Sequence, residues 1–303
     1  MNNITIVGAG LTGMIAAHIF PQARVLEATP EAELGQHRAL LRFRSEVVSE
    51  ATGIPFRAVT VRKGIWDGNR FIEPNICAAN SYSMKCTGKI LPRSVWNVDA
   101  CHRWIAPMNF IQQLRENLSS RVEYGTPFNF KALPTAASVI STVPMGIVAK
   151  QVGEQAAPTF SFNPIKVYRL DLGTGCDVHQ TVYFPFVDTL VYRASITGST
   201  LIIEAVDDLQ QGDLVSVQLA FGLGPVRLNQ CEISSQRYGK IAPIDEAFRR
   251  GFIYRLSDQF GVYSLGRFGT WRNILLDDVV HDCAVIKRLL LADSYARGRA
   301  RAV

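Results

Sequence analysis

Three closely spaced glycines near the start of the chain could hold a phosphorylated ligand. Gly8, Gly10 and Gly13 stand in the segment GAGLTG, directly after the apolar run Ile4–Val7 and before a stretch with helical spacing. In such an arrangement the first glycine makes the turn, the second lets a pyrophosphate approach the helix N-terminus, and the third allows close packing. Glu27 ends the next expected strand, where its carboxylate could accept both ribose hydroxyls and would disfavour a 2′-phosphate. The pattern predicts a dinucleotide site, for which FAD and NAD remain alternatives.

A second glycine turn lies near the other end of the chain. The segment reads as a short strand over 262–265, followed by Gly266, Arg267, Phe268 and Gly269 and then by a helix. It comes about 250 residues after the first turn. Two such turns suggest one ligand that is held from both ends of the chain, which favours FAD over NAD.

Four stretches together resemble a known family. They are the first glycine turn with Glu27, RVEYG with ASVISTVPM (121–125 and 137–145), TVYFPFVDTLVYRASIT (181–197), and GRFGTW with the LDD that follows (266–278). Their order is similar to that in the FAD-containing amine oxidase superfamily, and within it to the branch of UDP-galactopyranose mutase and protoporphyrinogen oxidase. After Glu27, only Gly35, Gln36 and His37 match the core of the mutases' GpH loop. The resemblance implies bound FAD, with contacts from Gly8, Gly10, Leu11, Thr12, Gly13, Glu27, Arg38, Val122, Gly266, Arg267, Trp271 and Asp277.

The same resemblance implies three candidate catalytic residues. Lys240, in QRYGKIAPI, is similar to the lysine that amine oxidases hold near flavin N5 through a water, although a solvent-exposed lysine on a strand is the alternative. Tyr238 is expected on the same face of that strand. His37 would contact the flavin, or else be an exposed histidine of a loop.

Charged and aromatic residues in the middle of the chain are candidates for substrate binding. Arg193 lies among β-branched apolar residues, where a charge is costly unless it is paired, so we expect it to face the site and hold a carboxylate or phosphate. Tyr183 and Trp66 could line the pocket, or could be core residues. Arg42, like Arg38, has a planar fork suited to pyrophosphate or an anionic substrate, with a solvated surface as the alternative.

These residues would be positioned by an α/β fold with two domains. We expect a Rossmann-like FAD-binding domain of the glutathione-reductase type and a second, mainly antiparallel β substrate domain. An amphipathic helix is predicted over 106–118, and strands are predicted in KVYRLDLG, TVYFPF and STLIIEAV. The FAD-binding domain is expected to take residues 1–53, 105–158 and 244–303, and the substrate domain 54–104 and 159–243.

Composition limits the classes of protein to consider. The chain has 303 residues, of which 48% are hydrophobic, enough for one large core or two ordinary ones, and its length favours two domains. No apolar run reaches the roughly 20 residues of a membrane helix, and no signal peptide is evident, so a cytoplasmic location is expected. The scattered cysteines and histidines predict no metal site. The net charge of +6 includes a tail with Arg297, Arg299 and Arg301, either solvated or bound to nucleic acid.

The leading functional hypothesis is an FAD-dependent oxidoreductase or lyase. It would oxidise the carbon–nitrogen bond of an amine or amino-acid substrate by hydride transfer to flavin N5. The chain also looks like compact phage-type amine oxidases, for which the substrate would be an amino-acid-modified nucleotide or DNA base. The alternatives are a flavin-dependent sugar-nucleotide mutase and a flavin-bound protein without catalysis. A membrane partner is not expected, and the oligomeric state is not predicted.

Overall fold

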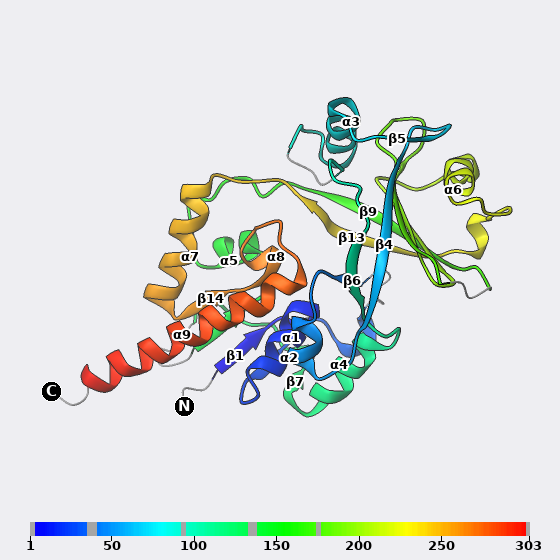
Figure 1. Cartoon of the computed structure of the whole chain (residues 1–303). Helices are drawn as coiled ribbons and strands as arrows, with labels where there is room; N and C mark the ends of the chain where they lie inside the picture. The colour runs from blue at the N-terminus through cyan, green and yellow to red at the C-terminus, as the bar shows by residue number, and fades with distance from the viewer. Residues whose placement is uncertain (1–3, 35–40, 92–94, 133–137, 174–176, 301–303) are drawn as a thin grey trace.

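The fold contains a parallel sheet and a larger, mostly antiparallel sheet (Figure 1). The computed structural model describes residues 4–34, 41–91, 95–132, 138–173 and 177–300, with side chains as far as residue 292. Every strand pair of the five-stranded sheet is parallel. Its strands, in spatial order, are β14 (Val262–Ser264), β8 (Ser138–Ser141), β1 (Ile4–Val7), β2 (Arg24–Leu26) and β7 (Val122–Glu123).

Helices bury both faces of the parallel sheet, and the central strands β1 and β8 are accordingly buried along nearly their whole length. One face packs against α1 (Leu11–Ile19), α4 (Phe110–Leu118) and α9 (Leu276–Ala300). The other packs against α5 (Met145–Gln151) and α7 (Glu246–Phe260). The central strands therefore lie in a dry core that fixes their carboxyl ends.

The larger sheet has nine strands in the part of the chain that the structure describes. Neighbouring strands are antiparallel except for β10 and β4, which are parallel. The order is β13 (Glu232–Ile241), β9 (Phe162–Asp171), β12 (Thr200–Ala205), β11 (Val191–Thr197), β10 (His179–Tyr183), β4 (Arg57–Trp66), β6 (Cys101–Ile105) and β3 (Arg42–Phe43), with β5 (Phe71–Ile72) beside β4.

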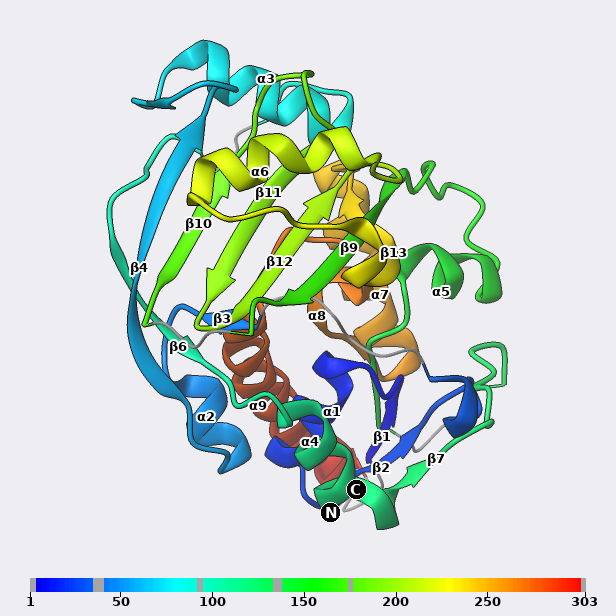
Figure 2. The same cartoon turned by 90° about the vertical axis from the view of Figure 1, so that its right-hand side faces the viewer.

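The two faces of this sheet have different neighbours. Leu201 and Ile203 of β12 pack toward α6 (Leu214–Phe221), whereas Ile202 packs toward α3 (Ile76–Thr87). We call these faces the α6 face and the α3 face. Figures 1 and 2 show α6 on one side of the sheet and α8 (Gly266–Gly269) and α9 on the other, so the α3 face looks toward the parallel sheet. The remaining helical segments are α2 (Val47–Thr52), η1 (Glu31–Glu33), η2 (Ser119–Arg121), η3 (Gln211–Asp213) and η4 (Leu228–Gln230).

The lysine of α3 attaches that helix to the large sheet. Lys85 Nζ donates to the carbonyl oxygens of Phe184, Phe186 and Val191, at 2.9, 2.6 and 2.6 Å. Burial lowers the pKa of Lys85 to about 8, which Asp188 partly offsets. Tyr82 packs its ring against Tyr183 from the same helix turn. Helix α3 is thereby held on the face that carries the polar cluster described below.

The predicted fold class is confirmed as a mixed α/β fold with a parallel and a mainly antiparallel sheet. The strands predicted at 4–7 and in the three central segments are present. The predicted helix over 106–118 begins instead at Phe110, because residues 107–109 form a turn in which the Phe110 N–H donates to the Pro107 carbonyl. Among the described residues, none of the helices combines the length and apolar character that crossing a bilayer requires.

Candidate functional site

The first glycine turn has the geometry of a phosphate-binding loop. Gly8 has φ +99°, and a Cβ on it would lie 2.3 Å from the Thr142 hydroxyl oxygen. A Cβ on Gly13 would lie 1.8 Å from the carbonyl oxygen of Gly8. At Gly10, by contrast, a Cβ would meet open space within 4 Å, so the loop leaves room where an anion would approach.

The N-terminus of α1 opens onto the same space. Gly10 is its N-cap, no side chain among the described residues caps the helix by a hydrogen bond, and no acidic residue lies in its first turn. The first N–H groups of a helix and the positive end of its dipole attract anions. Together with the space at Gly10, these groups fit the pyrophosphate of a dinucleotide.

Glu27 follows β2 and reaches back to the glycine loop. Its Oε2 accepts a hydrogen bond from the Ala9 N–H at 2.7 Å, and its Oε1 accepts one from the Thr29 N–H at 2.9 Å. Each carboxylate oxygen can accept a second hydrogen bond, so both ribose hydroxyls could be bound as well. Val122 of β7 pairs with Val25 of the neighbouring strand β2. Val122 therefore lies beside the edge of the site that Glu27 marks.

The second glycine turn packs directly on the first. Gly266 has φ +79°, and a Cβ on it would lie 2.5 Å from the Thr12 methyl carbon in the first turn of α1. The Leu265 N–H donates to the Ser141 carbonyl at 2.8 Å. Segments from the two ends of the chain therefore meet at the N-terminus of α1, as the two turns predict.

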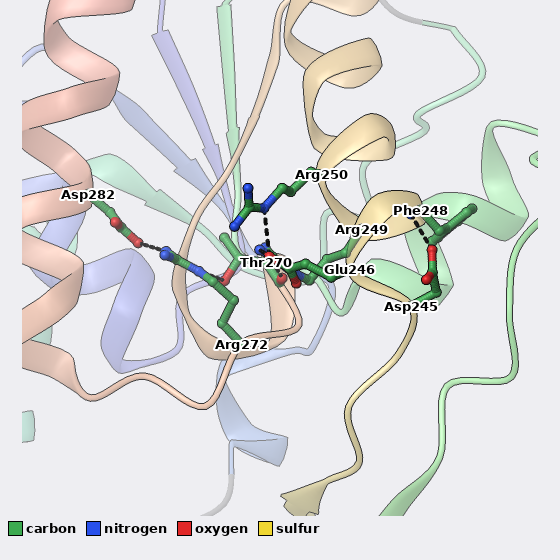
Figure 3. A network of polar contacts seen from close by, with 8 residues as sticks. All are labelled: Asp245, Glu246, Phe248, Arg249, Arg250, Thr270, Arg272 and Asp282. Atoms are coloured by element: carbon green, nitrogen blue, oxygen red, sulfur yellow. Dashed lines mark hydrogen bonds and ion pairs between the residues drawn. The ribbon is translucent and has the colours of Figure 1, made fainter.

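A polar network holds the second turn between α7 and α9 (Figure 3). Arg249 of α7 donates to the Thr270 carbonyl at 3.3 Å, and the Arg272 guanidinium donates to the Thr270 hydroxyl at 3.2 Å while pairing with Asp282 of α9. The Thr270 hydroxyl in turn donates to the Gly266 carbonyl at 2.7 Å. Figure 3 shows Arg249 and Arg272 at Thr270, whereas Arg250 pairs with Glu246, so two arginines tie Thr270 to α7 and, through Asp282, to α9.

Two further residues predicted to bind cofactor have partners inside the protein. Trp271 has φ +48°, is buried, and donates its indole N–H to the Ala242 carbonyl at 2.9 Å. Asp277 Oδ1 accepts from the N–H and hydroxyl of Ser45, at 2.8 and 2.9 Å. These contacts give both residues a structural role next to the second turn, and their contact with cofactor stays a prediction.

The α3 face of the large sheet carries a polar cluster of four residues. Arg193 donates from Nε and Nη2 to the two carboxylate oxygens of Glu204, and the Tyr192 hydroxyl donates to Glu204 Oε1 at 3.0 Å. Lys240 Nζ lies 4.4 Å from the centroid of the Tyr192 ring. The structure thus brings together Lys240 and Arg193, which were singled out separately in the sequence.

A backbone contact connects this cluster to the second glycine turn. Arg267 Nη2 donates to the carbonyl oxygen of Gly239 at 3.4 Å. Gly239 directly precedes Lys240 in β13, and Tyr238 packs its ring against Phe268 of the same turn. Lys240 therefore emerges from the strand segment that contacts the predicted cofactor turn.

The environment fixes the charge states of the cluster. Burial would raise the pKa of Glu204, but the Arg193 guanidinium overcomes this and holds it below its usual value. Burial and the adjacent Glu204 raise the pKa of Tyr192 well above that of a free phenol. Burial alone would lower the pKa of Arg193, yet Glu204 raises it. At neutral pH the carboxylate and guanidinium are charged and the phenol is neutral.

Other sequence-predicted residues are distributed differently from expectation. Tyr183 lies on the α3 face, with its ring 5.5 Å from that of Tyr82. Trp66 packs on the α6 face against Phe71, because its neighbour Ile65 is the residue aligned with Tyr183. Tyr183 and Trp66 therefore do not line one pocket.

Tyr238 and Lys240, which the sequence predicts on one face of a strand, contact different residues. A register shift between Gln236 and Lys240 breaks the alternation of β13. As a result Tyr238 packs with Phe162 and Phe268, while Lys240 lies over Tyr192. His37 and Arg38 lie outside the described residues.

Arg42 has a different partner from those expected of it. It reaches from β3 to the β10–β11 hairpin and donates to the hydroxyls of Thr181 and Thr197, both at 2.7 Å, and to the Ile196 carbonyl at 2.5 Å. Burial and the nearby Arg193 charge lower its pKa to about 10. Its acceptors are neutral, so Arg42 adds positive charge beside the cluster.

Sequence reasoning missed Glu204 and Tyr192. Glu204 is the acid in the otherwise apolar run LIIEA, and the argument applied to Arg193, that a charge in such a strand needs a partner, would have identified it. Tyr192 carried no comparable signal, because its role depends on an irregularity in β11. No group of three or more His, Cys, Asp or Glu in the described part of the chain could hold a metal.

A cavity of about 880 Å³ lies elsewhere, at one end of the large sheet. Its apolar wall includes Leu170, Leu172, Phe221, Leu223 and Val226, which pack on the α6 face. The cavity is therefore separated by the sheet from Arg193 and Lys240, and it is not part of the candidate site.

Comparison with known proteins identifies the fold. No protein-family model and no curated protein sequence matches the chain. A solved structure of reduced UDP-galactopyranose mutase is similar with a TM-score of 0.65 at 15% identity, over 96% of this chain and 94% of that one. A fatty acid isomerase from P. acnes has a TM-score of 0.58 at 11% identity (95% and 98% covered). Aklavinone-11 hydroxylase, solved with FAD and aklavinone, has a TM-score of 0.50 at 13% identity (93% and 60%). At these identities the likeness is one of fold, and it shows that this chain has a fold shared with FAD-dependent flavoenzymes.

Proposed function

We propose that this protein is an FAD-dependent oxidoreductase that oxidises the carbon–nitrogen bond of an amine-type or amino-acid-type substrate bearing an anionic group. The observation that carries the proposal is the Arg267–Gly239 hydrogen bond, which joins the second glycine turn to the strand that presents Lys240 beside Arg193 and Glu204. We further propose the glutathione-reductase type of Rossmann domain, the two-domain division given above, and a cytoplasmic location.

The residues at the two glycine turns fit FAD. The space at Gly10 and the N-terminus of α1 would receive the pyrophosphate, and Glu27 would accept the ribose hydroxyls. Gly266 and Arg267 would lie along the other side of the cofactor. When bound, FAD supplies a hydride acceptor, and the protein's contribution is to orient the substrate and exclude water.

The charges of the α3 face suit an anionic substrate group. Lys240 and Arg193 carry two positive charges against the single negative charge of Glu204, and Arg42 adds a third cation nearby. A carboxylate or phosphate of the substrate would balance this excess. Lys240 would hold the polar reacting group by an N–H bond, and Tyr183 would form part of the wall.

The absorption spectrum of the FAD-loaded protein under anaerobic conditions tests this function. We expect the visible absorption band of the oxidised flavin to bleach on addition of an amino acid, an amine or an amino-acid-modified nucleotide. The matching hydroxy acid should not bleach this band. Failure of every amine to bleach a protein that binds FAD would contradict carbon–nitrogen oxidation. Failure to bind FAD at all would contradict the cofactor assignment itself.

A flavin-dependent sugar-nucleotide mutase is the second candidate. The positive excess around Arg42, Arg193 and Lys240 would also suit the diphosphate of a sugar nucleotide. Such an enzyme would act only after the flavin is reduced and would consume no oxygen. Turnover of a sugar nucleotide after dithionite treatment, with no bleaching by amines, would favour this candidate.

Replacing Glu27 by glutamine tests the ribose contact. Glutamine keeps one acceptor oxygen but places an amide N–H₂ opposite a backbone N–H or a ribose hydroxyl, so we expect FAD affinity to fall about tenfold, the effect of losing one charge-assisted hydrogen bond. Fluorescence titration of the apoprotein with FAD measures the change. Glu33→Gln removes the same charge from the exposed helix η1 and should leave the affinity unchanged.

A further inference from the structure

The Tyr192 ring joins the lysine and the carboxylate of the polar cluster. The ammonium of Lys240 lies over the face of this ring, 4.4 Å from its centroid. The hydroxyl at the edge of the same ring donates to Glu204 Oε1 at 3.0 Å. The ring is fully buried, so its position is fixed by its neighbours on the α3 face. The position of the ammonium therefore depends on what fixes Tyr192.

An irregularity in β11 allows Glu204 to fix Tyr192 and Arg193 at once. In a regular strand, consecutive residues point to opposite faces of the sheet. Here the pairing with β12 runs from Val191–Ala205 to Arg193–Glu204, so β11 contains an extra residue. Both Tyr192 and Arg193 consequently reach the same carboxylate.

The charges around Glu204 come from three elements. Arg193 and Tyr192 face it from β11, and Lys240 faces it from β13. From α3, Tyr82 and Cys86 lie next to the arginine and the tyrosine. Of these groups, Glu204 alone is a carboxylate, and only 5% of its surface is exposed. It is thus the anion that attracts the Lys240 ammonium toward the Tyr192 ring, in addition to pairing with Arg193.

We propose that Glu204 is a positioning residue for Lys240: its carboxylate fixes the Tyr192 ring and retains the protonated ammonium on that ring's face. The proposal rests on the proposed function, in which Lys240 is presented to the cofactor. Arg193 neutralises the carboxylate. Its Nε–H and Nη2–H groups already donate to Glu204, so they do not bind a substrate anion. The anionic group of the substrate is then left to Arg42.

The test compares Glu204→Gln with the double variant Arg193→Gln/Glu204→Gln in the FAD-loaded protein. The double variant removes both charges together, so it leaves no buried group unpaired if the single variant fails to fold. Lysines are labelled by reductive ¹³C-methylation, and the Lys240 resonance is assigned by its loss in Lys240→Arg. Its titration is then followed by NMR.

We expect the titration midpoint of Lys240 to fall by about one pH unit or more in Glu204→Gln, the effect of removing an opposite charge, and to fall less in the double variant, where a like charge is removed as well. Asp208→Asn is the matched control: Asp208 pairs with Lys166 at 3.0 Å, so this variant should move the Lys166 resonance and not that of Lys240. An unchanged Lys240 midpoint in folded Glu204→Gln would overturn the proposal, as would a double variant whose Lys240 midpoint is no lower than that of Arg193→Gln.

The flavin spectrum separates this proposal from the proposed function. If the Lys240 midpoint falls and the bound FAD absorption band also shifts in Glu204→Gln, both are supported. If the midpoint falls and the band of bound FAD is unaltered, Glu204 still positions Lys240, and the placement of Lys240 beside the flavin is contradicted instead.

Discussion

Replacing Gly13 by alanine is expected to destabilise the protein by about 3 kcal/mol or more and to abolish FAD binding. The added methyl group would lie 1.8 Å from the Gly8 carbonyl oxygen, and both atoms belong to the backbone framework of the loop and helix. Neither can move without separating α1 from β1, and overpacking of this kind costs 1–3 kcal/mol even where side chains can adjust. Urea unfolding of the apoprotein measures the loss.

Gly10→Ala is the matched variant in the same loop. Gly10 has φ −68° and ψ 177°, which alanine adopts without strain, and its added methyl group would meet open space. We therefore expect apoprotein stability to change by less than about 1 kcal/mol, the range for a glycine-to-alanine change at an N-cap. FAD affinity should nevertheless fall at least about tenfold, because the methyl group fills the space intended for the phosphate. Equal loss of stability in both variants would contradict this division of roles.

Arg193→Met is expected to destabilise the protein by about 3 kcal/mol. It leaves the Glu204 carboxylate buried without its cation, and breaking a buried ion pair from one side costs about 3–5 kcal/mol. We take the lower end of this range because 35% of the Arg193 side-chain surface remains exposed to solvent. The free energy of unfolding in urea at pH 7 gives the value.

The pH dependence of this loss provides a second readout. With Arg193 present, the pKa of Glu204 is held below its usual value, so its stabilising contribution exists above about pH 4.5 and is lost as pH falls further. Without Arg193, burial raises the pKa of Glu204, so the variant gains stability as pH falls and the carboxyl is protonated. The difference in the free energy of unfolding between wild type and Arg193→Met should therefore become smaller as the pH is lowered. A difference in the free energy of unfolding that stays constant with pH would argue against a stabilising Arg193–Glu204 ion pair. The same conclusion would follow if the double variant Arg193→Met/Glu204→Leu were as unstable as Arg193→Met.

The two glycine turns of the proposed cofactor site could be predicted from the sequence because their signals are local. The turn at Gly8–Gly13 and the turn at Gly266–Gly269 each combine a strand, glycines and a helix within a short segment. Backbone geometry explains why these residues are glycines: Gly8 and Gly266 adopt positive φ, and a side chain on Gly13 has no space. The contact between Gly266 and Thr12 was also expected, because two turns that hold one ligand must lie close together.

The substrate side was only half predictable, because it depends on strand register. Lys240 and Arg193 were recognisable by type, but the ring and carboxylate that join them were not. The extra residue in β11 and the shift in β13 decide which side chains share a face, and neither is visible in the alternation of apolar and polar residues. The same cause misplaced Tyr238. Trp66 was misplaced because the pairing of β4 with β10 sets its face, and that pairing joins segments far apart in the sequence.

The packing of Gly266 on Thr12 has a consequence for the order in which the protein matures. During synthesis, β1 and α1 are made long before their packing partners in β14, α8 and α9. The apolar face of α1 therefore stays uncovered until these later segments have been made. Contacts of such long sequence separation form slowly. If the two glycine turns hold one ligand, as proposed, that site would be complete only once α9 has docked, so binding of the ligand and completion of the fold would be one late event.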